Sequence, residues 1–285
     1  MGTLYLVATP IGNLEDISAR ALRILSQVGL IAAEDTRHTG VLLKHFEIST
    51  PMTSYYEYNK LGRLDEILKA LSKGDVALVS DAGTPALNDP GYELVCSVLA
   101  AGYAVSPIPG PSAPIAALVA SGRPADHFLY LGYLPRKAQE RKRLLLEVAE
   151  LPYTLIFLES PHRFLDSISQ MLTIFGDRQI AVARELTKLY EEIFRGTIAE
   201  AHNHFTISVP RGEFTLVVQG KNAKPEKWDE ADLMREANNL LHQGCPPTEI
   251  ASRLAGVSGW SRREIYRRIT GLTSAGSPDK AENES

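Results

Sequence analysis

Three short loops rich in glycine and proline contain the side chains best suited to holding a small polar ligand. Each follows an apolar run, and their sequences are Thr-Pro-Ile-Gly-Asn at 9–13, Ser-Asp-Ala-Gly-Thr-Pro at 80–85 and Pro-Gly-Pro-Ser-Ala at 109–113. Glycine lets a backbone approach a ligand closely, proline holds a loop in one shape, and a carboxylate accepts hydrogen bonds from a hydroxyl or an amine. Any one loop is also explained as an ordinary turn, but three similarly placed loops favour a ligand cleft.

Acidic and basic side chains beside two other strand-like segments are suited to moving or orienting a proton. These candidates are Glu34, Asp35, Glu185 and Lys188. A positioned base accelerates a reaction by roughly 10²–10⁴-fold, and a lysine acts as one only if burial or a nearby cation, here Arg184, lowers its pKa. The alternative is a structural ion-pair network of Arg184, Glu185 and Lys188, and both interpretations stay open.

The elements that must position these residues alternate between strands and helices in the first part of the chain. Strands are predicted at Thr3–Thr9, Leu30–Ala33, Val76–Val79 and Ala104–Ile108, and helices at Asp16–Gln27, Thr36–Phe46, Leu61–Leu71 and Pro90–Ala101. This order predicts a largely parallel sheet, which binds ligands at the carboxyl ends of its strands. We therefore expect an α/β cofactor-binding domain over residues 1–121.

A second α/β series follows a Ser-Gly-Arg-Pro segment at 121–124 and predicts another domain over residues 122–222. Its expected strands are Phe128–Leu131, Tyr153–Leu158, Gln179–Ala183, Ile193–Gly196 and Phe214–Val218, and its expected helices are Gln139–Ala149 and Arg163–Ile174. The last strand is apolar and β-branched, so we expect it to be central.

A small helical unit is expected after the second domain. Residues 226–272 contain a short helix, a Gly-Val-Ser turn and an arginine-rich helix, which is typical of a helix-turn-helix. Residues 273–285 are rich in serine, proline and acids, which predicts a disordered tail.

Two clusters of cations could bind the phosphates of a nucleic acid. The first opens a predicted helix and contains Arg136, Lys137, Arg141, Lys142 and Arg143. The second, on the last helix of the small unit, contains Arg262, Arg263, Arg267 and Arg268, with Tyr266 among them as a stacking platform. The alternatives are a solvated helix face for the first cluster and, for the second, a helical cap whose arginines pair with acids of the main body.

Composition and missing motifs exclude several protein classes. The chain has 285 residues, a formal net charge of −4 and 44% hydrophobic residues, and no apolar run approaches the ~18 residues of a membrane helix. G-x-G-x-x-G, G-x-x-x-x-G-K-[ST], H-E-x-x-H and G-x-S-x-G are absent, and His202 and His204 have no third ligand nearby, so we expect no metal site. Cys96 and Cys245 form no CxxC pair and the N-terminus has no basic n-region, so we expect a cytoplasmic protein without a signal peptide.

Six segments together resemble the ribosomal RNA small-subunit methyltransferase I family, a group of the tetrapyrrole-methylase type. The resemblance runs in order over about residues 3–220, with the family's sequence and spacing. The segments lie at 9–13 followed by 33–37, 80–85, 108–113, 158–163 and 183–188.

The resemblance implies the two-domain tetrapyrrole-methylase α/β fold, with S-adenosylmethionine in the cleft between the domains and a C-terminal helical extension. By motif position, the cofactor-binding residues would be Ile11, Gly12, Asp81, Thr84, Ser112, Ala113 and Leu158. The implied product is a 2'-O-methylated cytidine in the decoding region of 16S rRNA, and the implied state is a homodimer.

Two other functions remain open. A methyltransferase for a corrin or porphyrin precursor would have the same fold, but such a substrate needs neither the cation clusters nor the helical tail. A ligand-sensing protein that binds nucleic acid suits the tail, but most of the chain builds a cleft.

Overall fold

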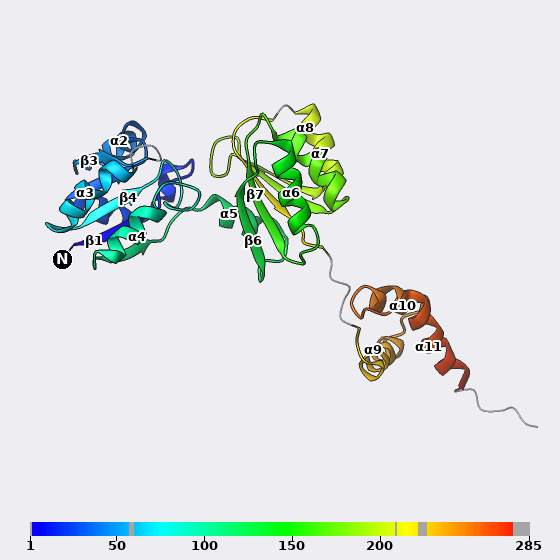
Figure 1. Cartoon of the computed structure of the whole chain (residues 1–285). Coiled ribbons are helices and arrows are strands. Elements are labelled where there is room, and N and C mark those ends of the chain that lie inside the picture. Colours follow the sequence, from blue (N-terminus) through cyan, green and yellow to red (C-terminus); the bar gives the residue numbers. More distant parts are fainter. Residues whose placement is uncertain (1, 57–59, 209, 222–226, 276–285) are drawn as a thin grey trace, which may run out of the picture. The chain divides into compact units, whose positions relative to one another are not determined.

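The computed structural model describes residues 2–56, 60–208, 210–221 and 227–275. The chain divides into two compact units, residues 1–221 and residues 222–285, which are described separately (Figure 1). No described helix combines the length and the apolarity that a membrane crossing requires.

The first sheet of the larger unit consists of five parallel strands in the order β3-β2-β4-β1-β5. The strands are β1 (Thr3–Val7), β2 (Leu30–Ala33), β3 (Met52–Ser54), β4 (Val76–Val79) and β5 (Ala104–Ile108). All four residues of the central strand β4 are buried, as expected for a strand covered on both faces.

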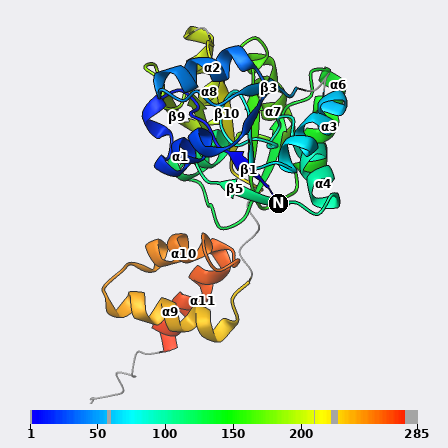
Figure 2. The same ribbon diagram turned by 90° about the vertical axis from the view of Figure 1, so that its left-hand side faces the viewer.

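Helices cover both faces of this sheet (Figure 2). One face is covered by α1 (Ala19–Gln27) and α2 (Thr36–His45), and the other by α3 (Lys60–Leu71) and α4 (Tyr92–Ala100). The helix predicted at Asp16–Gln27 is divided into a 3₁₀ turn, Leu14–Asp16, and α1. The division arises because Ser18 caps α1, its hydroxyl accepting the N–H of Ala21 at 3.1 Å.

The second sheet is mixed and has the order β6-β7-β10-β8-β9. Its strands are β6 (Phe128–Tyr133), β7 (Thr154–Glu159), β8 (Gln179–Arg184), β9 (Glu192–Thr197) and β10 (Phe214–Val218). Strands β6 and β7 are parallel, and all other pairs are antiparallel. Strand β10 is fully buried at the centre, which confirms the prediction for this segment.

Helices cover the second sheet on both faces as well (Figure 1). Helices α6 (Ala138–Val148), α7 (Phe164–Phe175) and α8 (Ile198–Ile207) bury a core rich in phenylalanine against one face. The other face is covered by α5 (Ala113–Ala120), through Ala117 and Leu118. The sequence-based boundary at 121 assigns α5 to the first domain, but the helix packs on the second sheet and so connects the two sheets.

The smaller unit is a three-helix cluster formed by α9 (Glu230–His242), α10 (Pro247–Ala255) and α11 (Arg262–Ala275). Its core includes Trp260, whose indole N–H donates to the Trp228 carbonyl at 2.8 Å. Helix α11 continues past the expected boundary at residue 272. Residues 222–226, between the second domain and the small unit, and residues 276–285 of the predicted tail lie outside the described residues.

Candidate active site

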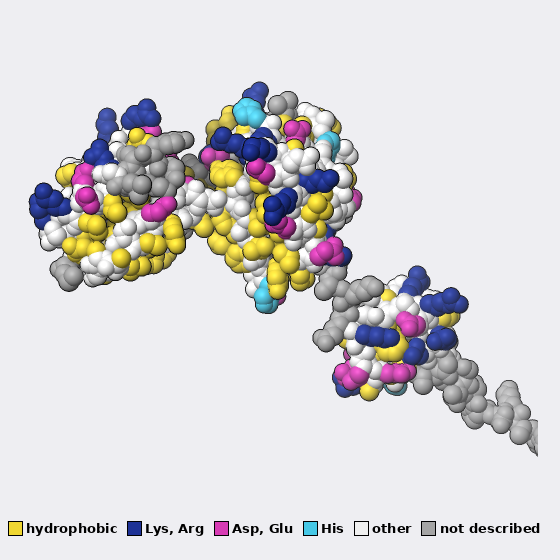
Figure 3. All heavy atoms as spheres, in the orientation of Figure 1, with side chains coloured by type: hydrophobic (Ala, Val, Ile, Leu, Met, Phe, Trp, Pro, Cys, Tyr) yellow, Lys and Arg dark blue, Asp and Glu magenta, His cyan; other side chains and the backbone are white. Residues whose placement is uncertain are grey.

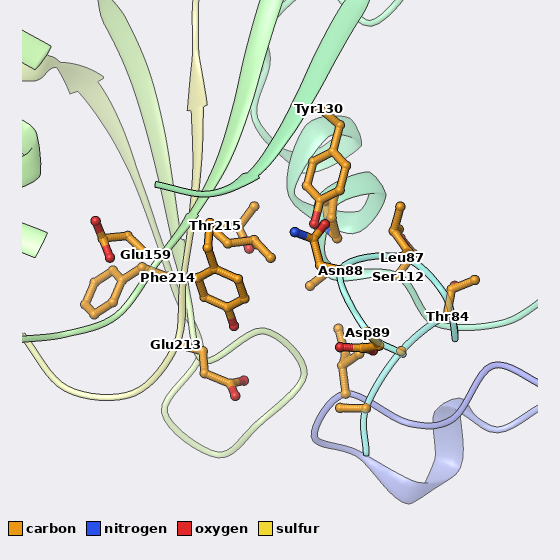
Figure 4. A pocket seen from close by; sticks show the side chains of 17 residues that line it. Thr84, Leu87, Asn88, Asp89, Ser112, Tyr130, Glu159, Glu213, Phe214 and Thr215 are labelled. Carbon is orange, nitrogen blue, oxygen red and sulfur yellow. The ribbon is translucent and has the colours of Figure 1, made fainter. Parts of the chain in front are cut away.

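A cavity lies where the loops after β1, β4 and β5 meet the ends of β6, β7 and β10. Its volume is about 670 Å³, including its opening to solvent, which is typical of small-molecule sites. Figure 4 shows Thr84 and Asp89 on the loop after β4, facing Glu213, Phe214 and Thr215 at the start of β10. The site therefore combines the carboxyl edge of the parallel sheet with one end of the mixed sheet.

Five of the seven residues expected to bind the cofactor line this cavity. They are Ile11, Thr84, Ser112, Ala113 and Leu158. Gly12 is not part of the lining, and Asp81 lines a neighbouring hollow beside α2 instead. The structure thus brings together side chains from three loops and the second sheet, as the spacing of the loops predicts.

Hydrogen bonds hold the three loops to one another. The backbones of Thr9 and Gly83 exchange two hydrogen bonds of 2.9 and 3.0 Å, and the Thr84 hydroxyl donates to the Pro111 carbonyl at 3.2 Å. Gly83 has a φ of +83°, a conformation that side chains rarely adopt, so its position requires glycine. These hydrogen bonds therefore fix the three loops that form this wall of the cavity.

The lining suits a ligand that has both polar and apolar parts. Ile11, Ala113 and Phe214 provide apolar wall, and the Ser112 hydroxyl oxygen is buried without a hydrogen-bond partner. A buried polar atom without a partner is uncommon in native proteins and is explained when a ligand completes it. These residues fit S-adenosylmethionine, which has a ring system, a sugar and charged ends.

Three acidic residues gather on the side of the cavity formed by the first sheet. Glu34 accepts the N–H of Asp81 at 3.2 Å, and Asp81 accepts the N–H of Asp35 at 3.1 Å. Burial raises the pKa of Asp89 to about 6, and the charges of Glu34 and Asp81 add to this, against an opposing hydrogen bond from Ser80. Burial also raises the pKa of Glu34, helped by the charges of Asp81 and Asp35.

Asp35 has a different environment from Glu34. Its carboxylate caps α2 by accepting the Arg37 N–H at 2.8 Å, and it pairs with the Arg37 guanidinium at 2.6 Å. These hydrogen bonds hold the pKa of Asp35 well below its usual range. Among the predicted acids of this side, Glu34 is therefore the stronger base.

An ion-pair network adjoins the cavity on the side formed by the second sheet, and its member Glu213 lines the cavity. The Lys188 ammonium donates to Glu185 at 2.9 Å and to Glu213 at 3.1 Å. Burial acts to lower the pKa of Lys188, but the two carboxylates outweigh burial and raise it. A basic lysine needs a pKa shift in the opposite direction. The ion-pair network offered as an alternative in the sequence analysis is thus present for Glu185 and Lys188. Arg184 is not part of it and pairs with Glu192 at 3.2 Å.

The backbone at this network has an unusual conformation. Glu185 and Thr187 have φ values of +52° and +63°, and a Cβ atom added to Gly212 would lie 2.3 Å from Glu185 Cδ. A Cβ atom added to Gly12 would likewise lie 2.3 Å from Lys188 Cγ. Gly12 therefore lets the loop after β1 approach the stem of Lys188, although it does not line the cavity.

Sequence reasoning missed Asp89, Glu213 and Glu159, which also line the cavity. Asp89 stands in an Asn-Asp-Pro turn, a signal that marks a turn but not the burial that raises its pKa. Glu213 precedes a strand, and the carboxyl-end rule does not apply to it because β10 is antiparallel to β7 and β8. Glu159 is fully buried and pairs with Arg163 at 2.6 Å.

The first cation cluster is only partly exposed. Arg141 is 6% exposed, and its guanidinium donates to Gln170 at 2.6 Å, so it does not lie on the solvent-facing side of α6. Arg136 and Lys142 are exposed, and Lys137 forms an exposed pair with Glu140. Arg143 likewise pairs with a neighbouring acid one helical turn away.

The second cation cluster likewise consists of one arginine that packs within its unit and three that are exposed. Arg268 pairs with Glu230 at 2.8 Å and lies 4.2 Å from the centroid of the Trp260 ring, so it stabilises the small unit. Three arginines, Arg262, Arg263 and Arg267, are exposed on the same helix. Figure 3 shows Lys and Arg side chains on the surface of this unit.

Comparisons with known proteins agree with this architecture. Residues 3–202 match the family of tetrapyrrole (corrin/porphyrin) methylases. Among solved structures, uroporphyrin-III C-methyltransferase from Thermus thermophilus superposes with a TM-score of 0.53 at 20% identity, covering 76% of this chain and 94% of that one. The methyltransferase CobJ superposes with a TM-score of 0.57 at 18% identity, covering 77% and 95%. At such identities, these structures show a shared fold.

Relatives with higher identity extend over nearly the whole chain. A ribosomal RNA small subunit methyltransferase I from Halalkalibacterium halodurans is 46% identical over 270 residues, 93% of each chain. One from Synechocystis sp. is 46% identical over 272 residues, 94% of this chain and 97% of the relative. The chain therefore belongs to the tetrapyrrole methylase family and, within it, to the ribosomal RNA small subunit methyltransferase I group.

Proposed function

We propose that this protein transfers a methyl group from S-adenosylmethionine to the ribose 2'-hydroxyl of a cytidine in the decoding region of 16S rRNA. The observation that carries the proposal is the identity of 46% over 93% of the chain with a relative named for rRNA methylation. The match is long enough to include part of the small helical unit, which a macrocycle substrate would not require.

S-adenosylmethionine is the methyl donor of this family, and when bound it supplies a methyl group on a positively charged sulfur. Ile11, Ala113 and Leu158 offer it apolar contacts, and Thr84 and Ser112 offer hydroxyl groups. Asp81 and Gly12 act at the edge of the site. Asp81 belongs to the acidic group of the first side, and Gly12 lets the loop after β1 approach Lys188.

The acidic side of the cavity supplies the proton acceptor. Asp89 lines the cavity, and its pKa of about 6 lets it be ionised at neutral pH while remaining a better base than an exposed carboxylate. Glu34 and Asp81 keep that pKa high through their charges. Asp89 would accept the proton of the 2'-hydroxyl when that oxygen takes up the methyl group that the donor would supply.

The opposite side holds the sugar in place. Lys188 is protonated and donates two of its three N–H groups to Glu185 and Glu213. Its third N–H group has no partner among the described residues. A ribose oxygen can accept that hydrogen bond. Positioning of this kind aligns the 2'-oxygen with the methyl group.

The exposed cations provide the contacts with RNA. Arg136 and Lys142 on one unit and the three exposed arginines of α11 are suited to phosphates, whereas Arg141 and Arg268 stabilise their own units. The triple charge reversal of Arg262, Arg263 and Arg267 should weaken rRNA binding and flatten its salt dependence.

The matched control for the triple variant is Arg268→Ala. Loss of its contacts with Glu230 and Trp260 should lower the unfolding temperature of the small unit. Binding titrations at several salt concentrations, with calorimetric scans, separate the two effects. Unchanged RNA binding by the triple variant would remove the small unit from the interface with RNA.

We further propose a cytoplasmic homodimer. Helices α4 and α5 expose large apolar side chains, namely Tyr92, Leu99, Ile115 and Val119. Figure 3 shows apolar surface over the part of the larger unit where α4 lies. Such surface is suited to a second copy of the chain, and sedimentation analysis of the purified protein measures the oligomeric state.

The test of the function compares acceptors directly. Purified protein and labelled S-adenosylmethionine are incubated with small ribosomal subunits from cells lacking this protein, and separately with a porphyrin precursor. Label should enter only 16S rRNA, at one cytidine whose 3' phosphodiester resists alkali because its 2'-oxygen is blocked. Label in the macrocycle would support the corrin or porphyrin alternative, and RNA binding without turnover would support a ligand-sensing protein.

A further inference from the structure

A second hollow lies directly behind the Glu185–Lys188 ion pair. Its volume is about 520 Å³, and it is lined by Arg184, Glu185, Tyr190, Arg211 and Gly212. We call it the Tyr190 hollow. Glu185 lines this hollow, Glu213 lines the cavity, and Lys188 binds both carboxylates, so the ion-pair network connects the walls of the two spaces.

The loop at the mouth of the Tyr190 hollow presents apolar side chains to water. Tyr190 is 72% exposed and Leu189 is 88% exposed. The loop is nevertheless ordered by hydrogen bonds, because the Thr187 N–H donates to Glu191 at 2.6 Å and the Lys188 N–H donates to the Glu185 carbonyl at 3.0 Å. An aromatic ring held in solvent by a strained, hydrogen-bonded loop is typical of a recognition surface.

The lining of the Tyr190 hollow contains two arginines and one glutamate. Arg211 is exposed and forms no ion pair with any other described residue. Arg184 pairs through one terminal nitrogen with Glu192, but its Nε atom is buried without a hydrogen-bond partner. The carboxylate of Glu185 is neutralised by Lys188. The guanidinium of Arg211 is therefore available beside an exposed ring.

We propose that the Tyr190 hollow binds the nucleotide adjacent to the target in a single RNA strand. Tyr190 stacks on the base of that nucleotide, and Arg211 binds its phosphate. The inference rests on the proposed function and names how the same site reads its substrate. An unpaired strand is required because the target ribose must enter the cavity on the other side of Lys188, and splayed bases are recognised by stacking on aromatic rings.

The test uses the full-length protein and a labelled single-stranded RNA of about a dozen nucleotides containing the methylated sequence. Tyr190→Ala should weaken binding by about 5- to 150-fold, the range that loss of one stacked base produces. Tyr190→Phe should bind like the parent chain because it keeps the ring. Arg211→Ala should weaken binding and reduce its salt dependence.

Tyr153→Ala is the matched control, since Tyr153 is 43% exposed and directly precedes β7, at the end of that strand opposite the cavity-lining Leu158. It should leave RNA binding unchanged. Affinity for S-adenosylmethionine, measured by calorimetry, should be the same in all four variants, which shows that the cavity remains intact.

The outcomes distinguish this inference from the proposed function. Equal RNA affinity of Tyr190→Ala and the parent chain, or equal losses in Tyr190→Ala and Tyr153→Ala, would overturn the inference even if methylation is observed. An equally large loss of affinity for duplex RNA in Tyr190→Ala would also overturn the inference. Weaker binding by Tyr190→Ala alone supports it, and does so even if the parent chain methylates no RNA, a result that would count against the proposed function.

Discussion

Both sides of the cavity contain carboxyl groups, but those on one side have no cation partner in the described chain and those on the other share a lysine. On the side of the first sheet, no ion pair joins Glu34, Asp81 or Asp89 to a described cation, and burial raises the pKa values of Glu34 and Asp89. On the side of the second sheet, Glu185 and Glu213 share Lys188, and the pKa of Glu185 is lowered by that contact despite burial. Carboxyl groups that lack a cation keep proton affinity, whereas paired ones become fixed charges. The first side is therefore suited to chemistry and the second to positioning.

The largest expected difference between the two sides is in the rate of methyl transfer. Asp89→Asn removes the proposed proton acceptor and should lower the single-turnover rate by roughly 10²–10⁴-fold. Lys188→Ala removes one positioning contact and should lower the rate by only about 10-fold, close to the lower limit for one hydrogen bond to a charged group. Rapid-quench assays at saturating donor, with donor affinity measured separately, give both rates.

A larger loss of rate in Lys188→Ala than in Asp89→Asn would contradict the roles assigned to the two sides. A rate in Asp89→Asn close to that of the parent chain, together with a loss of 100-fold or more in Lys188→Ala, would indicate that the lysine is the base. It would also mean that RNA or donor binding reverses the direction of the pKa shift of Lys188.

The next effect concerns the rigidity of the second side. Gly212→Ala places a methyl group 2.3 Å from Glu185 Cδ at a φ of +81°, so Glu185 and its contact with Lys188 must move. Gly176→Ala is the control, since Gly176 has a φ of +74° and no atom within 4 Å of the added Cβ. The control should lose about 1 kcal/mol of unfolding free energy from the backbone alone, and Gly212→Ala about 2–3 kcal/mol.

Urea denaturation of both variants measures the difference, and methylation assays show its consequence. Only Gly212→Ala should also lose activity, because Gly176 lies at the end of α7, outside the cavity lining. Equal losses of stability in the two variants would show that the packing at Glu185 tolerates displacement.

The sequence predicted the first side better than the second for a structural reason. In a parallel sheet every carboxyl end lies at one edge, so the loops at 9–13, 80–85 and 109–113 could be assigned to one cleft from their order along the chain. Ile11, Thr84 and Ser112 within them were implied by the family resemblance. In the mixed sheet the edge alternates between strand starts and strand ends. Glu213 could therefore be placed only once the antiparallel pairing of β10 was known.

Packing against the rest of the fold was also beyond sequence reasoning. Helix α5 is apolar on all sides, with the sequence Ala-Pro-Ile-Ala-Ala-Leu-Val-Ala, so no helical period marks it. The separation of Arg141 and Arg268 from their exposed neighbours depends on contacts with Gln170 and Trp260, which lie 29 and 8 residues away. Charge type is visible in a sequence, but the partner of a charge is set by tertiary structure.

A smaller effect is expected on stability and tests the first side without any substrate. The pKa of Asp89 rises from 3.8 to about 6 on folding, so the stability that its proton contributes is complete below pH 3.8 and is lost as the pH rises through 6. Asp89→Asn should therefore stabilise the larger unit at pH 7.5 by about 1 kcal/mol, allowing for solvent screening of a partly exposed group. At pH 4 the gain should nearly vanish. Urea titrations at the two pH values measure it, and an equal gain at both would contradict the shift.

The smallest expected effect concerns the coupling between the acids of the first side. The rate of methyl transfer should rise with pH around a midpoint near 6, because Asp89 must be ionised to accept a proton. Glu34→Gln removes a neighbouring negative charge while keeping an oxygen that can accept the Asp81 N–H. The midpoint should therefore move to lower pH, since the remaining carboxyl loses its proton more easily. A midpoint that stays in place would mean that burial alone sets the pKa of Asp89, and the acids of the first side would then act independently of one another.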